Sequence, residues 1–155
     1  MPTALEDLKI LRSAEKIAET IWSEVSTWKS FDKRVVGEQI TRSADSIGAN
    51  IAEAYGRFHY GDKLKFLYYA RGSLFETKYW INRANIRKLI ASEKCDALVN
   101  ELRVLAVQIN SFSQSINQQR AGVSKIKEEQ TVYETSASAD NSIFSEEDIH
   151  AISTL

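Results

Sequence analysis

Proline and glycine are scarce in this chain. Its 155 residues include one Pro and six Gly, the two residue types that most often interrupt helices and form turns. This scarcity argues against a β fold with many tight turns, and long uninterrupted helices are expected. The length fits one domain, and a hydrophobic content of 43% is enough for one core.

Cysteine and long apolar runs are also lacking. The single Cys95 cannot form a disulfide within the chain, so nothing indicates a secreted, disulfide-stabilised scaffold. No run approaches the roughly 18 apolar residues that cross a bilayer. The first eleven residues already carry Glu6, Asp7 and Lys9, which is not typical of a signal peptide. We therefore expect a cytoplasmic protein without membrane association.

Histidine is too rare for the metal sites that helical bundles often hold. A carboxylate-bridged di-metal site needs Glu-x-x-His on two helices. The one pair with this spacing, Glu147 and His150, lies in an acidic tail, and the other histidine is His59. The sequence thus predicts no metal site and no cofactor.

Motifs for phosphate binding and nucleophilic catalysis are incomplete. Gly56 and Gly61 have the spacing of a phosphate-binding loop, but Asp-Lys follows them instead of Lys-Ser or Lys-Thr. Cys95 lies in an apolar helical stripe, where a small buried hydrophobic residue is the better interpretation than a nucleophile. We expect no enzymatic activity and no catalytic residues.

Apolar residues recur at steps of three and four in four segments, as in amphipathic helices. The stripes run from Ile10 to Trp28, from Val36 to Phe58, from Leu67 to Ala84 and from Cys95 to Ile116. Thr3 to Glu6 form a capping box at the start of the first segment. Residues 29–32 break the pattern after that segment, and Asp62 and Ser92 are candidate caps of the last two. We predict an all-α fold, an antiparallel up-down-up-down four-helix bundle over residues 1–120.

The charge is divided unevenly along the chain. Residues 1–125 carry 19 Lys and Arg against 14 Asp and Glu, and residues 126–155 carry one Lys against seven acids, which gives the net charge of −1. We expect residues 121–155 to form a disordered acidic C-terminal tail, with a short amphipathic helix near residues 143–152. That short helix either folds on a partner or belongs to a merely solubilising tail.

The third segment has a second apolar stripe opposite its core face. Tyr68, Phe75, Tyr79 and Ile86 follow one another at steps of seven, four and seven. A helix that is apolar on two sides is usually buried on two sides, so the stripe is a candidate interface between copies of the chain. The alternative is amphipathic tyrosines lying on the surface.

The same region is basic. Eight Lys and Arg against two acids lie between Arg57 and Ile90, among aromatic residues, and such a mixture can contact phosphates and stack on bases. The alternative is a solvated rim around the oligomer interface. The candidate contacts to nucleic acid are Arg57, Lys63, Lys65, Arg83, Arg87 and Lys88.

The second segment holds a run of small and polar residues. Gly48 and Gly56 each cost about 1 kcal/mol relative to Ala inside a helix, so we expect close backbone packing there to offset that cost. The polar side chains predict a structural network of Arg42, Asn50, Glu53, Arg57 and, from the third segment, Glu76.

Two runs resemble the signatures of a known family. The run QITRSADSIGANIAEAYGR (residues 39–57) and the run FLYYARGSLFE (residues 66–76) are similar to the bacterial four-helix bundle family, also called the 23S rRNA intervening-sequence protein family. The resemblance covers roughly residues 5–118. The chain has Ala54 where the family often has Gly, and no Pro after Phe31.

The resemblance implies an antiparallel bundle that assembles into rings of five. Some family members are encoded inside inserts in ribosomal RNA genes, and distant relatives bind RNA and a reverse transcriptase. Two functions are therefore expected as alternatives. One is a self-assembling scaffold or adaptor, a homopentamer, and the other is binding of structured RNA or an RNA-associated protein.

Overall fold

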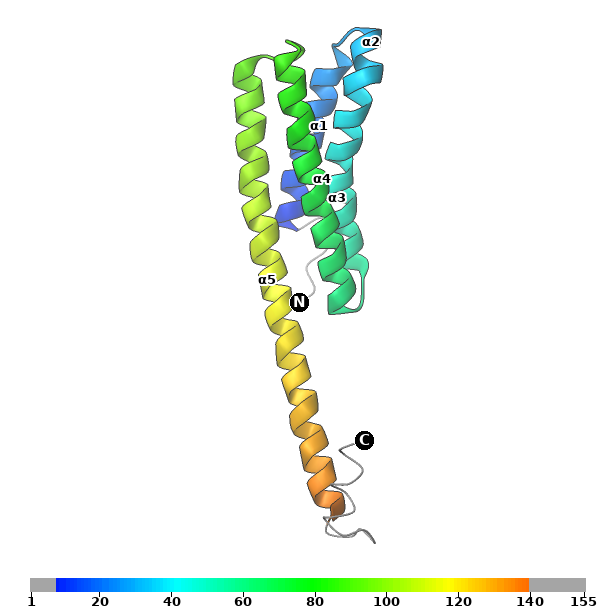
Figure 1. Cartoon of the computed structure of the whole chain (residues 1–155), viewed down its shortest axis with the longest axis vertical. Coiled ribbons are helices and arrows are strands. Elements are labelled where there is room, and N and C mark those ends of the chain that lie inside the picture. The colour runs from blue at the N-terminus through cyan, green and yellow to red at the C-terminus, as the bar shows by residue number, and fades with distance from the viewer. Residues whose placement is uncertain (1–7, 140–155) are drawn as a thin grey trace. The chain divides into compact units, whose positions relative to one another are not determined.

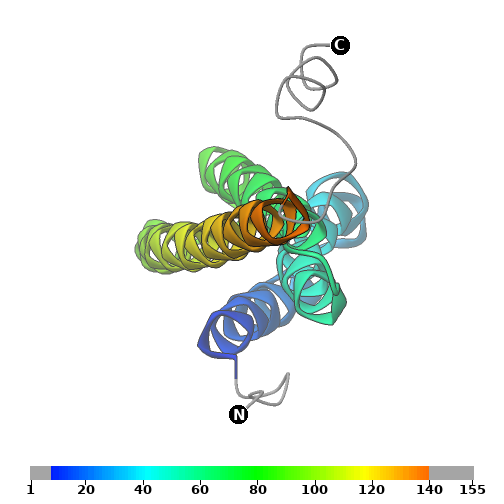
Figure 2. The ribbon, with the colours of Figure 1, turned by 90° about the horizontal axis from the view of Figure 1, so that it is seen from below.

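The computed structural model describes residues 8–139, with side chains as far as residue 131. Every regular element in this range is helical: α1 (Lys9–Ser26), α2 (Ser30–Asp32), the π-helical turn η2 (Lys33–Gly37), α3 (Glu38–Gly56), α4 (Tyr60–Ile86) and α5 (Ser92–Ala139). Helices α1, α3, α4 and the part of α5 up to residue 117 lie side by side as a four-helix bundle (Figures 1 and 2). Short turns join successive helices, so neighbours along the chain run antiparallel. The predicted fold class is confirmed.

The four predicted stripes supply the core. Ile17, Ile47, Leu74 and Leu105, one from each long helix, are almost completely buried. The buried Thr77 donates a hydrogen bond of 3.1 Å to the Ser43 hydroxyl, which links α4 to α3. Phe58 was expected to close the second stripe, but it is 91% exposed. The reason is that α3 ends at Gly56, so Phe58 lies in the turn.

The helix boundaries differ from prediction at several ends. Within the described residues α1 begins at Lys9, after Leu8 in an extended conformation, and the predicted capping box at Thr3 lies outside them. Helix α4 begins at Tyr60, before the predicted cap Asp62, and the residue at its cap position makes no side-chain cap. Ser92 is the first residue of α5, and its hydroxyl donates to Asn85 across the turn.

The expected break at residues 29–32 is shorter than predicted. Residues 30–32 already form the single turn α2, and η2 then joins this turn to α3. The π-helical turn changes the phase of the helix faces between α2 and α3. It also brings Gly37 against α1, where a Cβ on Gly37 would lie 2.7 Å from Val25 Cγ1.

The prediction of disorder from residue 121 is wrong as far as Ala139, because α5 continues to that residue. Residues 118–131 are all exposed and belong to a second compact unit that begins at Gln118. Gln, Arg, Lys and Glu predominate here and no Pro occurs, so local helix propensity accounts for the helix without burial. The short helix expected near 143–152 lies outside the described residues.

Candidate interaction surfaces

The second apolar stripe of α4 faces away from the core. Tyr68, Phe75, Tyr79 and Ile86 are each between 51% and 67% exposed, whereas Leu67, Leu74 and Ile81 on the opposite side of the same helix are buried. We call these four exposed side chains the α4 ridge. Four large apolar side chains in one row are typical of a surface that contacts another molecule.

Cations frame the α4 ridge on both sides. At about 100° per residue, Arg71 and Lys78 border one edge and Lys65 and Arg83 the other. The Arg71 guanidinium lies 5.1 Å from the centre of the Phe75 ring, and the Lys65 ammonium lies 5.8 Å from that of Tyr69. The α4 surface is therefore apolar along its middle and mainly positively charged at its edges, where four cations outnumber the exposed Glu76.

The six cations predicted to contact nucleic acid fall into two groups at opposite ends of α4. Arg57, Lys63 and Lys65 lie at its start and Arg83, Arg87 and Lys88 at its end. The 18 residues between Lys65 and Arg83 correspond to about 27 Å of helix. One protomer thus presents two small basic patches instead of one continuous surface.

Some of these cations are held by the bundle itself. Arg57 pairs with Glu53, and its guanidinium lies 4.7 Å from the centre of the Phe66 ring. Lys63 donates a hydrogen bond of 3.2 Å to the Tyr55 carbonyl. Arg83 is half-buried, and its Nε finds no hydrogen-bond acceptor among the described residues. Such an unpaired buried donor costs about 1–3 kcal/mol unless a further molecule supplies an acceptor.

The predicted polar network divides into two separate contacts. One is the Glu53 and Arg57 pair within α3. In the other, the Asn50 amide donates to the Ser46 carbonyl at 2.8 Å and to the Ser73 hydroxyl at 3.5 Å, which ties α3 to α4. Arg42 and Glu76 are exposed, and within residues 8–131 their side chains join neither contact. These contacts stabilise the protomer and indicate no catalytic or ligand-binding role.

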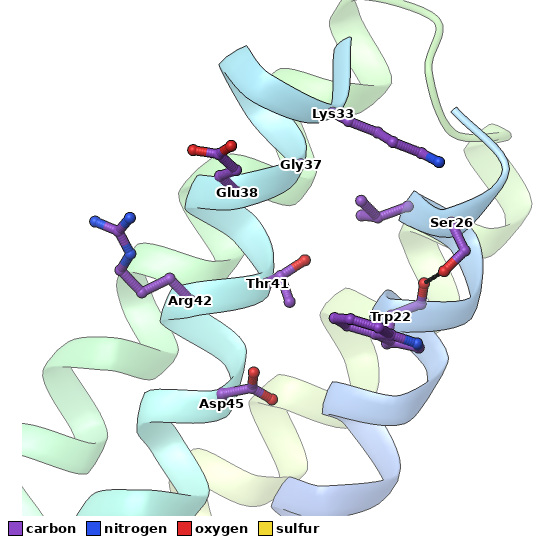
Figure 3. Close-up of a pocket in the computed structure, with 9 residues that line it drawn as sticks. Trp22, Ser26, Lys33, Gly37, Glu38, Thr41, Arg42 and Asp45 are labelled. Atoms are coloured by element: carbon purple, nitrogen blue, oxygen red, sulfur yellow. Dashed lines mark hydrogen bonds between the residues drawn. The ribbon is translucent and has the colours of Figure 1, made fainter. Parts of the chain in front are cut away.

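A groove runs between α1 and α3, and the sequence interpretation missed it. Its widest section, with a volume of about 580 Å³, lies beside η2 and is lined by both helices. Figure 3 shows Trp22 of α1 facing Thr41 and Asp45 of α3, while Lys33 reaches from η2 toward α1. Trp22 is 60% exposed although it is a large aromatic residue.

The groove continues along α3 toward its end. The middle section shares Asp45 with the first section and is lined mainly by small residues. The last section shares Ala49 and Ala52 with the middle section and reaches Arg57. We call the whole, from Gly37 to Arg57 on α3 and from Leu11 to Ser26 on α1, the α1/α3 groove. The run of small residues on the second segment was the available sequence signal.

The prediction of close backbone packing at Gly48 and Gly56 is wrong. A Cβ on Gly48 would lie 3.7 Å from the nearest atom, an ordinary contact, and a Cβ on Gly56 would meet nothing within 4 Å. Both glycines line the groove instead. The protomer itself therefore does not offset their cost in helix stability, which is about 1 kcal/mol each.

Comparison with known proteins identifies the family. Residues 6–111 match the family model described as 23S rRNA-intervening sequence protein. The chain belongs to this family. The matched residues include both the α4 ridge and the α1/α3 groove, so both surfaces lie within the region that the family shares.

A protein of known structure has a similar fold. The chain is similar to the crystal structure of a protein with unknown function from the S23 ribosomal protein family of Bacteroides thetaiotaomicron VPI-5482. The two are 25% identical, with a TM-score of 0.61, over 67% of this chain and 97% of that one. A comparison with curated proteins gives no match.

The remaining candidate chemistry of this family member is limited. Cys95 is buried, as predicted, and burial together with the neighbouring Asp96 carboxylate raises the pKa of its thiol. Over the described part of the chain, no three His, Cys, Asp or Glu side chains converge to hold a metal ion. None of the helices described combines the length and the hydropathy needed to cross a bilayer.

Proposed function

We propose that this chain is a non-enzymatic, self-assembling helical-bundle scaffold whose first partner is another copy of itself, in a homopentamer. The observation that carries the proposal is the α4 ridge, a row of four large apolar side chains that the protomer leaves half exposed. Exposed apolar rows of this kind are costly in water and are typical of protein interfaces.

The size of the ridge supports an interface of ordinary dimensions. A large aromatic side chain buries about 150–250 Å² when fully covered, so the exposed halves of the three aromatic ridge residues supply roughly 225–375 Å², and Ile86 adds to this area. A standard interface takes about 800 Å² from each partner. The ridge thus has the area of an interface centre, and the cations that frame it extend the contact to the usual size.

Replacing Phe75 and Tyr79 together by Glu tests the proposal. Because two carboxylates would take the place of apolar side chains at the centre of the interface, the assembly should dissociate, and light scattering after gel filtration should give a lower mass. Circular dichroism should show that helicity survives, since both residues point away from the core. The control Val107→Glu alters an equally exposed apolar residue on α5 and should leave the mass unchanged. If the paired variant keeps the wild-type mass, the ridge is not the interface.

RNA binding is the second candidate function. The family description names the intervening sequence of 23S rRNA, and Arg87 and Lys88 are exposed cations that form no ion pair within the described residues. A ring of protomers would repeat each basic patch around its axis, which compensates for the small size of the patch on one protomer. Phosphate contacts of this kind are sensitive to salt.

A retention assay with a structured RNA tests this second function. We expect binding that weakens steeply between about 50 and 200 mM salt. Arg87→Glu with Lys88→Glu should weaken it and lower the salt slope by about 2. The control Lys29→Glu with Arg34→Glu makes the same change of charge at exposed positions outside both patches. Equal effects of the two variants, or no retention at low salt, would contradict RNA binding through α4.

A further inference from the structure

We propose that the α1/α3 groove of one protomer receives the α4 ridge of a second copy, so that the interface joins two different surfaces of the chain. This inference rests on the proposed self-assembly and names the surface against which the ridge packs. The groove is lined by α1, η2 and α3, whereas the ridge lies on α4. One protomer can therefore use both surfaces at once.

The two surfaces match in length and shape. The groove follows α3 for about 20 residues, or about 30 Å, and the ridge from Tyr68 to Ile86 spans about 27 Å. The ridge consists of large side chains, while the small residues Gly48, Ala49 and Ala52 leave room for them in the groove. Small residues at a crossing allow two helices to approach within 8–10 Å, as ridge-into-groove packing requires.

The charges of the two surfaces are complementary at the middle section of the groove. The middle section of the groove is lined by three acids, Glu15, Glu19 and Asp45, and by no cation among its described lining residues. The ridge is framed by Lys65, Arg71, Lys78 and Arg83. Packing of the ridge into the groove would bring these cations to the acidic side chains. The resulting ion pairs would contribute more to the specificity and rate of association than to its affinity.

The contact also accounts for three features that the protomer leaves unexplained. Gly48 and Gly56 occupy helical positions where a Cβ would fit, and a second copy in the groove supplies the close packing that favours glycine. Trp22 is exposed beside the widest section and would be covered. The unpaired Nε of Arg83 would reach acceptors on the partner. In the assembly, the low helix propensity of the two glycines, the exposure of Trp22 and the unpaired Arg83 Nε would all be compensated by contacts with the second copy.

Such an interface has a direct structural consequence. When two different surfaces of one chain bind each other, every protomer has one ridge and one groove to offer, and the contact repeats from copy to copy. A repeated contact of this type closes into a ring when the rotation between neighbours permits. Ridge-to-ridge packing would instead give closed pairs.

Mixing two variants tests the inference. In the groove variant, Ala49→Arg places a long cation at an exposed groove position, which blocks entry of the ridge. In the ridge variant, Phe75→Glu is combined with Tyr79→Glu. Each variant alone should give about 17.5 kDa, the mass of one chain, by light scattering at high micromolar concentration. The equimolar mixture should give about 35 kDa, twice the chain mass, because the groove variant keeps its ridge and the ridge variant keeps its groove.

Controls separate a blocked groove from a damaged fold. Ala97→Arg makes the same substitution at an exposed position of α5, outside both surfaces, and should keep the wild-type mass. A second groove variant, Glu15→Lys with Glu19→Lys, changes two exposed residues and should dissociate the assembly by repelling the framing cations. Circular dichroism should show wild-type helicity for all variants.

The outcomes distinguish this inference from the proposed function. If the wild-type chain itself gives 17.5 kDa, self-assembly is wrong. If the wild type assembles and both groove variants keep its mass, the chain self-assembles but the ridge packs against a different surface. If the mixture of single-surface variants stays at the mass of one chain, the groove does not receive the ridge.

Discussion

At the scale of single residues, Gly37 is the glycine of the described chain where an added Cβ would have the least room. A Cβ at Gly37 would lie 2.7 Å from Val25 Cγ1, nearer than packed carbon atoms allow. The tight approach holds η2 against the end of α1. Glycine is therefore required here for space, since its φ of −58° is open to any residue.

Gly37→Ala should destabilise the bundle by about 1–3 kcal/mol, the usual cost of overpacking. Urea unfolding followed by circular dichroism measures the change. In the Val25→Ala background the added methyl meets no Cγ1, so the cost of Gly37→Ala should largely disappear. Gly61→Ala, where the new Cβ meets nothing within 4 Å, should not destabilise. Equal costs of Gly37→Ala in both backgrounds would contradict the contact with Val25.

Cys95 should be unreactive in the folded protein. Burial, with a smaller effect of the Asp96 carboxylate, raises the pKa of its thiol, so the nucleophilic thiolate is scarce near neutral pH. A thiol reagent should label the native chain slowly and the chain in denaturant quickly. Because the folded-state pKa is raised, the neutral thiol stabilises the fold at low and neutral pH, and this contribution is lost as the pH rises through that pKa. Rapid native labelling would contradict the buried position.

At the scale of elements, the part of α5 from residue 118 to 139 forms a helix by local propensity. Its side chains are exposed throughout residues 118–131, so over these residues the helix is stabilised locally and without burial. Gly122 weakens it most, since glycine costs about 1 kcal/mol relative to alanine in an exposed helix.

Gly122→Ala should therefore make this helix more persistent. Hydrogen exchange of amides near residue 122 should slow about fivefold, the factor that corresponds to about 1 kcal/mol. The amides of the bundle core should exchange at unchanged rates, because residues up to 117 belong to a separate compact unit. Unchanged exchange around residue 122 would mean that this segment is not a propensity-driven helix.

The same elements show how far the sequence predicts the fold. Steps of three and four in apolar residues locate the four core faces, since burial follows the helical period directly. The pattern fails at residue 121 because an exposed helix needs no apolar stripe. It also cannot place η2, where a π-helical turn changes the phase of the helix. The end of α3 before Phe58 depends on the turn and is equally hidden from periodicity.

The candidate surfaces were predicted only in part, for a related reason. The ridge on α4 is visible in sequence because it is a second apolar stripe on one helix. The groove depends on two helices, with Trp22 on one and Asp45 on the other, and their pairing is a property of the fold. Small residues on α3 indicated close packing, but only the structure shows that the close neighbour is missing from the protomer at Gly56.

At the scale of the whole molecule, the central claim is that this family member exists as an assembly of identical chains. The exposed ridge, the groove and the unpaired Arg83 Nε are left uncovered in a single chain and would become contacts in the proposed assembly. Stability of the fold and assembly should consequently be linked, because binding of a partner stabilises the folded state.

The most direct test is the mass of the unmodified chain in solution, by light scattering after gel filtration at micromolar concentration. We predict a multiple of 17.5 kDa, and for the proposed pentamer about 88 kDa, five times the mass of one chain. A mass of 17.5 kDa, unchanged as the protein concentration is raised, would contradict the account.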